Sequence, residues 1–231
     1  MRPSKLLSLA LAATLAVFFL TAAVAVPMLC RPYYYAQIDA LDLPAQTDWS
    51  EQTIRTAYDE VMDYLVYGAP FGTGALRSSA SGRAHFADCR VLFRLDLALL
   101  GGTSAVLLVI GLLYHRGRLA FHRFWGRGPA FWAAVCLTVA FLLLALWAIR
   151  DFDGLFTAFH RVFFPGKTNW IFDPQTDAII CILPTAFWAR TGGLVLALCL
   201  GGASLTALVA ERRARRRPFD RHAQKPSRRT S

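Results

Sequence analysis

The chain has 231 residues, 55% of them hydrophobic, and carries a formal net charge of +10. This apolar share exceeds that of typical soluble domains, and long apolar runs predict a membrane protein. The sequence contains no phosphate-binding loop, dinucleotide fingerprint, Gly-x-Ser-x-Gly elbow or His-Glu-x-x-His motif, which excludes the enzyme classes recognised by these motifs.

The first apolar run covers residues 6–26 and follows Arg2 and Lys5. Ala23-Val24-Ala25 resembles a signal-peptide cleavage site. The run is nevertheless as long as a membrane-crossing helix, roughly 20 residues, whereas signal-peptide cores have roughly 7–15. We therefore expect a retained transmembrane helix.

Three more apolar runs follow, at residues 95–114, 129–149 and 191–210. The last contains two Gly-Gly pairs, at 192–193 and 201–202, where a neighbouring helix could approach closely. The sequence thus predicts an all-α, polytopic membrane protein with four transmembrane helices.

Basic residues indicate the orientation of these helices. They fill the link 115–128 and the segment 211–231, and they precede the first run, whereas 27–94 is acidic on balance. Because positive segments stay in the cytoplasm, both termini are expected there, with 27–94 and 150–190 forming an extracellular cap. We expect the basic tail 211–231 to be disordered and to lie near anionic lipid rather than nucleic acid.

The first outer segment, 27–94, has one clear helical pattern. Asp48 or Ser50 is suited to cap a helix starting near Glu51. An apolar stripe follows at helical spacing, at Ile54, Tyr58, Val61 and Leu65. A link rich in Gly and Ser, 68–82, separates it from a helix that begins within 79–82 and continues into the second span.

The second outer segment, 150–190, is unusually aromatic for a connector. Its aromatic residues either anchor the chain at the lipid headgroups or, with a residue of the first outer segment, wall a pocket for acyl chains. The pocket candidates are Phe86, Phe156, Phe163, Phe164, Trp170 and Phe172.

Two histidines, His85 and His160, are predicted on the outer side, each at a membrane boundary. Histidine changes charge near neutral pH and is therefore suited to proton transfer. Asp88 lies at i+3 from His85, and Asp153 lies at i−7 from His160. The alternative is that each histidine only forms hydrogen bonds within its own segment.

Other chemistry is less well supported. Cys89 and His85 could form a nucleophile pair, but nothing in the sequence indicates a lowered thiol pKa. A metal site of the two histidines with Asp88, Asp173 or Asp177 would have no known ligand spacing. We expect neither a metal nor a cofactor.

Two segments resemble signatures of a family of bacterial four-helix membrane proteins that includes the lipoprotein intramolecular transacylases. The first is Ala84-His85-Phe86-Ala87-Asp88-Cys89-Arg90. The second is Phe159-His160-x-x-Phe163-Phe164, followed by Asn169-Trp170-x-Phe172-Asp173-Pro174-x-Thr176-Asp177 and Pro184-x-x-Phe187-Trp188. The resemblance extends to about residue 210.

The resemblance implies a membrane acyltransferase whose substrate is a diacylglyceryl lipoprotein with a free N-terminal Cys amine. One acyl chain would move from the glyceryl ester to that amine, leaving a lyso-form lipoprotein. We expect His85 and His160 to be catalytic, with Asp88 orienting His85 and with Asp153, Asp173 and Asp177 in supporting roles. The implied location is the bacterial cell membrane, with the active side extracellular and with lipoprotein and membrane lipids as partners; oligomeric state is left open. The competing classes are a non-catalytic four-span accessory or sensor protein and, with less support, a transporter.

Overall fold

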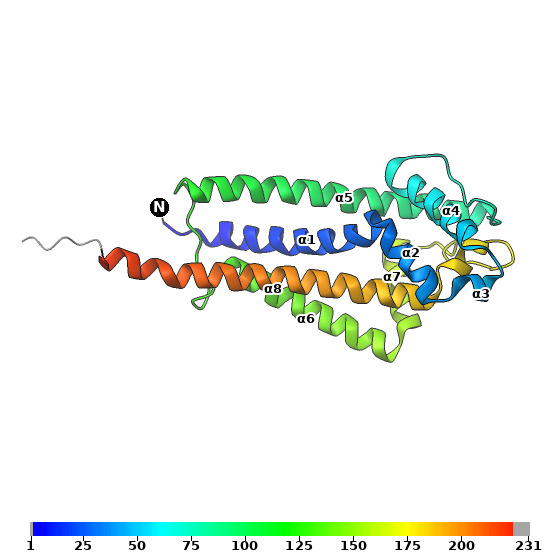
Figure 1. Ribbon diagram of the computed structural model, residues 1–231. Coiled ribbons are helices and arrows are strands. Elements are labelled where there is room, and N and C mark those ends of the chain that lie inside the picture. Colours follow the sequence, from blue (N-terminus) through cyan, green and yellow to red (C-terminus); the bar gives the residue numbers. More distant parts are fainter. Residues whose placement is uncertain (1, 224–231) are drawn as a thin grey trace, which may run out of the picture.

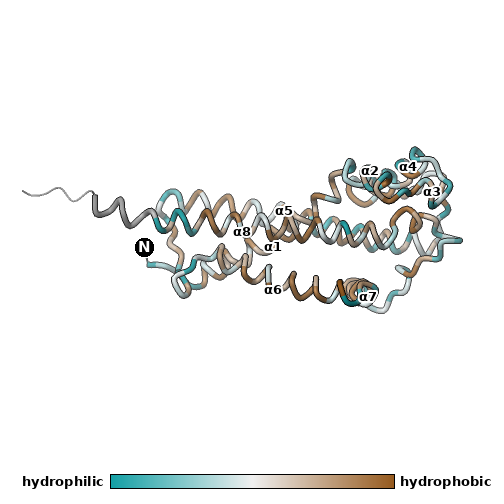
Figure 2. Tube along the Cα trace, turned by 60° about the horizontal axis from the view of Figure 1, so that its bottom comes forward, coloured by the Kyte–Doolittle hydropathy of each residue, from teal (hydrophilic) through white to brown (hydrophobic). Residues whose placement is uncertain are grey.

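Four long helices lie side by side in a computed structural model of the chain, which describes residues 2–223 and, for 216–223, the backbone alone (Figure 1). They are α1 (Lys5–Leu29), α5 (Ala80–His115), α6 (Pro129–Arg150) and α8 (Thr185–Ala223). Each is long and apolar enough to cross a membrane. Figure 2 shows hydrophobic residues along these helices and hydrophilic residues gathered towards the two ends of the molecule. The four predicted transmembrane helices are confirmed.

The helix α1 is central to the bundle, since it packs against α5, α6 and α8, while α6 also packs against α8. The buried residues between α1, α6 and α8 are mostly small: Ala23, Ala134, Leu137, Cys199, Ala203 and Ala207. A Cβ atom on Gly202 would lie 2.9 Å from a ring carbon of Phe19, so this glycine permits the close approach of α1 and α8. Gly192, Gly193 and Gly201 have no such neighbour within 4 Å.

Six short helices form a cap at one end of the bundle (Figure 1). They are α2 (Arg31–Ala40), α3 (Leu43–Thr47), α4 (Glu51–Met62), η1 (Asp63–Tyr67), α7 (Phe152–Phe163) and η2 (Ala178–Ile182). Ser50 caps α4 by accepting a hydrogen bond from the Thr53 amide, and the predicted stripe on α4 and η1 is buried. The helices α2, α3 and α7 were not predicted from the sequence.

The cap has a hydrophobic core of its own, made by both outer segments. Tyr34 of α2 stacks on Tyr58 of α4, with ring centroids 3.6 Å apart. Its buried hydroxyl donates to the carbonyl oxygen of Ile182 at 2.9 Å. These contacts join segment 27–94 to segment 150–190 in one hydrophobic core. The relative position of residues from the two segments depends on this core.

At the other end of the bundle, the link between α5 and α6 docks onto α1 and α8. The Ser8 hydroxyl accepts a hydrogen bond from the His122 amide, and Glu211 accepts one from the Gly128 amide and pairs with Arg123. The helix α8 continues through the basic segment to Ala223, where composition predicted disorder. Residues 224–231 of the predicted tail lie outside the described residues.

Candidate active site

A short amphipathic helix, α7, carries His160. The Asp151 side chain caps it by accepting a hydrogen bond from the Gly154 amide at 2.8 Å. Its apolar residues Phe152, Phe156, Phe159 and Phe163 recur at i, i+4, i+7 and i+11. That spacing is the signal that could have predicted α7, and it places the four Phe side chains on one face of the helix.

The first turns of α5, which precede its apolar run, carry His85. Ser79 caps the helix by accepting a hydrogen bond from the Gly82 amide. Asp177 of the second outer segment accepts hydrogen bonds from both the amide and the hydroxyl of Ser79, each at 2.8 Å. A Cβ atom on Gly82 would lie 2.1 Å from an Asp177 carboxylate oxygen, so the approach requires glycine. Asp177 therefore fastens the second outer segment to the start of α5.

The imidazole rings of His85 and His160 lie side by side, with centroids 5.7 Å apart. Both side chains are buried, with 5% and 6% of their surface exposed. Aromatic rings surround them: Phe86, Phe164 and Phe172 contact His85, and Phe156, Phe164 and Trp170 contact His160. Phe164 contacts both imidazole rings.

Hydrogen bonds differentiate the two rings. The Nδ1 of His160 lies 2.7 Å from the Phe156 carbonyl oxygen. Because a carbonyl oxygen only accepts, Nδ1 of His160 carries the hydrogen and Nε2 of the neutral ring keeps the lone pair. In His85 the Nε2 atom contacts the Cys89 sulfur at 3.3 Å, and Nδ1 is buried without a partner among the described residues.

Burial lowers the pKa of both histidines, because the charged form loses its hydration. The pKa of His85 falls to about 4, and the neighbouring His160 contributes to this shift. The pKa of His160 is lowered by burial, which outweighs the opposing effect of its bond to Phe156. Both rings are therefore neutral near pH 7, the state in which an imidazole accepts a proton or donates a neutral hydrogen bond.

Asp88 does not form a hydrogen bond with His85 in the described part of the chain. Its two carboxylate oxygens bind Lys167 and the Asn169 side-chain amide, the latter at 3.0 Å. These contacts, above all the one from Lys167, lower the pKa of Asp88. Asp88 thus holds the loop after α7 against α5. Its charge acts to raise the pKa of His85, but the larger effect of burial outweighs it.

The two other predicted acids lie away from the rings. Asp153 is exposed in the first turn of α7, about two turns from His160. Asp173 is exposed and accepts a hydrogen bond from the Gln175 amide, a local turn contact. The structure therefore brings together both histidines and the aromatic residues, while Asp88 and Asp177 hold the two outer segments in place.

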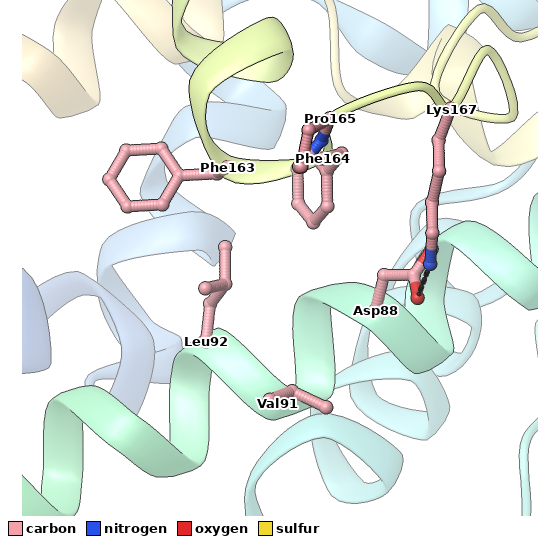
Figure 3. Close-up of a pocket in the computed structure, with 7 residues that line it drawn as sticks. All are labelled: Asp88, Val91, Leu92, Phe163, Phe164, Pro165 and Lys167. Atoms are coloured by element: carbon pink, nitrogen blue, oxygen red, sulfur yellow. Dashed lines mark hydrogen bonds and ion pairs between the residues drawn. The ribbon is translucent and has the colours of Figure 1, made fainter.

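An apolar groove of about 250 Å³ lies beside the histidines (Figure 3). It is lined by Asp88, Val91 and Leu92 of α5 and by Phe163, Phe164, Pro165 and Lys167. Figure 3 shows the Lys167 side chain reaching down to Asp88, with Phe164 between this ion pair and Phe163. Phe163, the one predicted pocket residue without a histidine contact, lines this groove. Phe164 also touches both imidazoles, so a single side chain connects the wall of the groove with the histidine pair.

The cysteines and acids of the described residues form no disulfide, metal site or nucleophile pair. None of the five cysteines forms a disulfide. Within residues 2–223, no group of three or more His, Cys, Asp or Glu side chains is arranged to hold a metal ion. Burial raises the pKa of the Cys89 thiol to about 12, so this group is a protonated thiol near neutral pH and a poor nucleophile.

Residues 9–188 match the model of a protein family described as "Lipoprotein intramolecular transacylase Lit". Among curated proteins, none matches the chain. The fold resembles the in meso structure of the membrane-integral lipoprotein intramolecular transacylase Lit from Bacillus cereus, with a TM-score of 0.83 and 22% identity over 93% of this chain and 97% of that one.

Two further structures of the Bacillus cereus protein, in which a histidine is replaced by arginine or by alanine, each match with a TM-score of 0.76 and 22% identity. They cover 95% and 93% of this chain and 94% of the other chain in both cases. At this identity the structural matches establish a shared fold.

Proposed function

The chain belongs to the lipoprotein intramolecular transacylase family, and on this basis we propose that His85 and His160 carry out its acyl transfer. The protein is an integral membrane acyltransferase of the transacylase type. The reaction moves one acyl chain from the glyceryl ester of a diacylglyceryl lipoprotein to the amine of its own N-terminal cysteine. The substrate therefore supplies the nucleophile, and the protein must supply a base, an oxyanion stabiliser and a dry site.

His160 is the general base. Its Nδ1–H is held by the Phe156 carbonyl, which leaves the Nε2 lone pair as the proton acceptor. As the amine nitrogen forms its bond to the ester carbonyl carbon, Nε2 takes the amine proton. When the bond from that carbon to the glyceryl oxygen breaks, the same proton passes to the glyceryl oxygen, so the protein ends unchanged.

His85 stabilises the oxyanion of the tetrahedral intermediate. Its only ring nitrogen without a partner is Nδ1, because Nε2 contacts Cys89. A donor that is fixed in place and shielded from water before the reaction stabilises developing charge more strongly than one in solvent. The aromatic rings around both histidines provide that shielding, and they keep water from competing with the amine.

The groove between α5 and the end of α7 receives the acyl chain that is transferred. Val91, Leu92, Phe163 and Phe164 line it with apolar surface, and it opens where α5 enters its apolar run. A lipid chain can therefore move sideways from the bilayer towards the histidines. With the basic segments in the cytoplasm, the cap and the histidines face the outside, on the side where the N-termini of lipoproteins lie.

The observation that carries this proposal is the pair of buried imidazoles 5.7 Å apart, one of them with a fixed lone pair. The test uses the purified protein in lipid nanodiscs with a synthetic diacylglyceryl lipopeptide that has a free N-terminal cysteine amine. Because the transfer conserves mass, fragmentation mass spectrometry must locate the acyl chain.

We expect one chain to move from ester to amide, and we expect a lipopeptide with an acetylated amine to remain unchanged. Release of free fatty acid, or no conversion of the free-amine substrate, would contradict the proposal.

A further inference from the structure

Cys89 is the one polar partner of His85 on its own helix. It lies four residues after His85, so the two side chains share one face of α5. The Cys89 sulfur is 3.3 Å from Nε2 of His85, within the range of a hydrogen bond to sulfur. Its thiol keeps its proton near neutral pH, as its burial dictates.

The direction of this bond determines which tautomer His85 adopts. The lone pair of an imidazole nitrogen is a strong acceptor, whereas thiol sulfur is a weak one. The hydrogen bond is therefore stronger when the thiol S–H donates to the Nε2 lone pair than when an Nε2–H donates to sulfur. When S–H donates to Nε2, the ring hydrogen of neutral His85 must sit on Nδ1.

The Nδ1 atom is the part of His85 that has no partner. It is buried, in a side chain that is 5% exposed, and no described residue binds it. A buried polar atom without a partner carries a free-energy cost, which a ligand can relieve by binding there. A hydrogen on this atom makes it a donor facing the reaction, as stabilisation of an oxyanion requires.

We propose that Cys89 is a positioning residue that fixes His85 as the Nδ1–H tautomer by donating its thiol hydrogen to Nε2. This inference rests on the proposed function of His85, and it assigns a role to a residue that touches neither the substrate nor the reacting atoms. It also gives the two histidines the same tautomer with opposite uses: His160 turns its lone pair to the reaction, and His85 turns its N–H.

The test combines a spectroscopic and a kinetic measurement on the full-length protein in nanodiscs at pH 7.5. Long-range ¹⁵N–¹H correlation spectra of ¹⁵N-histidine-labelled protein report which ring nitrogen of His85 carries hydrogen, and a His85→Gln variant assigns its signals. The spectra and the initial rate of acyl transfer are compared for wild type, Cys89→Ala, Cys89→Ser and the control Cys181→Ala. Cys181 is also half-buried and lies in the cap without a histidine contact.

We expect the wild type to carry the hydrogen on Nδ1. Cys89→Ala should show a mixture of tautomers and a rate about two- to tenfold lower, the effect of one weak hydrogen bond. Cys89→Ser should restore both the Nδ1–H tautomer and the rate, because a serine hydroxyl also donates a hydrogen bond. Cys181→Ala should match the wild type in both measurements.

A wild-type hydrogen on Nε2, or an unchanged tautomer in Cys89→Ala, would overturn the inference. The spectra answer this even if no acyl transfer occurs in any variant, whereas absent transfer in the wild type would contradict the proposed function instead.

Discussion

The imidazole rings of His85 and His160 lie with their centroids 5.7 Å apart, although α5 carries the first and α7, which follows α6, carries the second. Neither ring is placed by its own helix alone. Asp177 and Asp88 each bind residues of the other outer segment, at the start of α5 and in the loop after α7. The histidine pair is thus a product of the folded cap, and its geometry depends on those contacts.

The ion pair between Asp88 and Lys167 should hold the loop after α7 over the site. Because the pair is partly exposed, its loss should cost only about 0.2–1 kcal/mol, which corresponds to a rate of acyl transfer that is lower by a factor of about 1.4 to 5. We expect Asp88→Asn and Lys167→Met each to show this loss and their double variant to lose no more than the worse single one. Hydrogen exchange should increase at residues 164–177 in each variant.

A matched control for this pair is Glu51–Arg55, an ion pair on α4 at i,i+4 spacing. Glu51→Gln should leave both the rate and the exchange of 164–177 unchanged. Additive effects of Asp88→Asn and Lys167→Met would show that the two side chains act separately.

Val91 should help to set the length of acyl chain that the groove accepts. A Trp at this position fills space next to Leu92 and Phe164, so Val91→Trp should slow transfer of long chains more than transfer of short ones. The measurement is a competition between lipopeptides with long and short acyl chains. Val109→Trp is the control, because Val109 lies five turns further along the same face of α5 and is similarly exposed, 53% against 66% for Val91. An equal loss for every chain length in Val91→Trp would contradict a chain-binding groove.

The lowered pKa of His85 predicts that the fold weakens in acid. In the unfolded chain this imidazole takes up a proton near pH 6.5, whereas in the folded protein it does so only near pH 4. Its contribution to stability is therefore complete above pH 6.5 and is lost as the pH falls from 6.5 to 4, because only the unfolded state gains the proton in that range. We expect the Tm to drop over this range and to drop less in His85→Gln.

The control for this pH effect is His115→Gln, at an exposed position at the other end of the bundle. This variant should keep the acid sensitivity of the wild type. The same acid-induced drop in Tm in His85→Gln would mean that His85 is not the group responsible.

The sequence alone was sufficient to predict the helix bundle and part of the cap, because apolar run length and helical periodicity are local signals. The stripe from Ile54 to Leu65 and the start of α5 within 79–82 follow from such signals. The helix α7 was missed because its Phe residues were interpreted as an aromatic loop, although they recur at helical spacing.

The partners of the polar side chains could not be predicted in the same way. Asp88 lies at i+3 from His85, a spacing that favours contact on one helix, yet Lys167 and Asn169 take its oxygens. That choice depends on how the loop after α7 returns to α5, which is a long-range packing outcome. The i+4 contact from Cys89 to His85 was available from spacing, but the pair was considered only as a possible nucleophile and base, for which the sequence provides no support.

The most direct test of the account is the transfer rate of the single-histidine variants in the nanodisc assay. His85→Ala and His160→Ala should each lose at least about a hundredfold in rate, the usual contribution of a general acid or base, while His115→Ala retains the wild-type rate. Thermal unfolding of each variant at pH 7.5 should show that the fold persists. If a folded variant lacking either imidazole still converted ester to amide within a few-fold of the wild-type rate, the two-histidine account of this site would be contradicted.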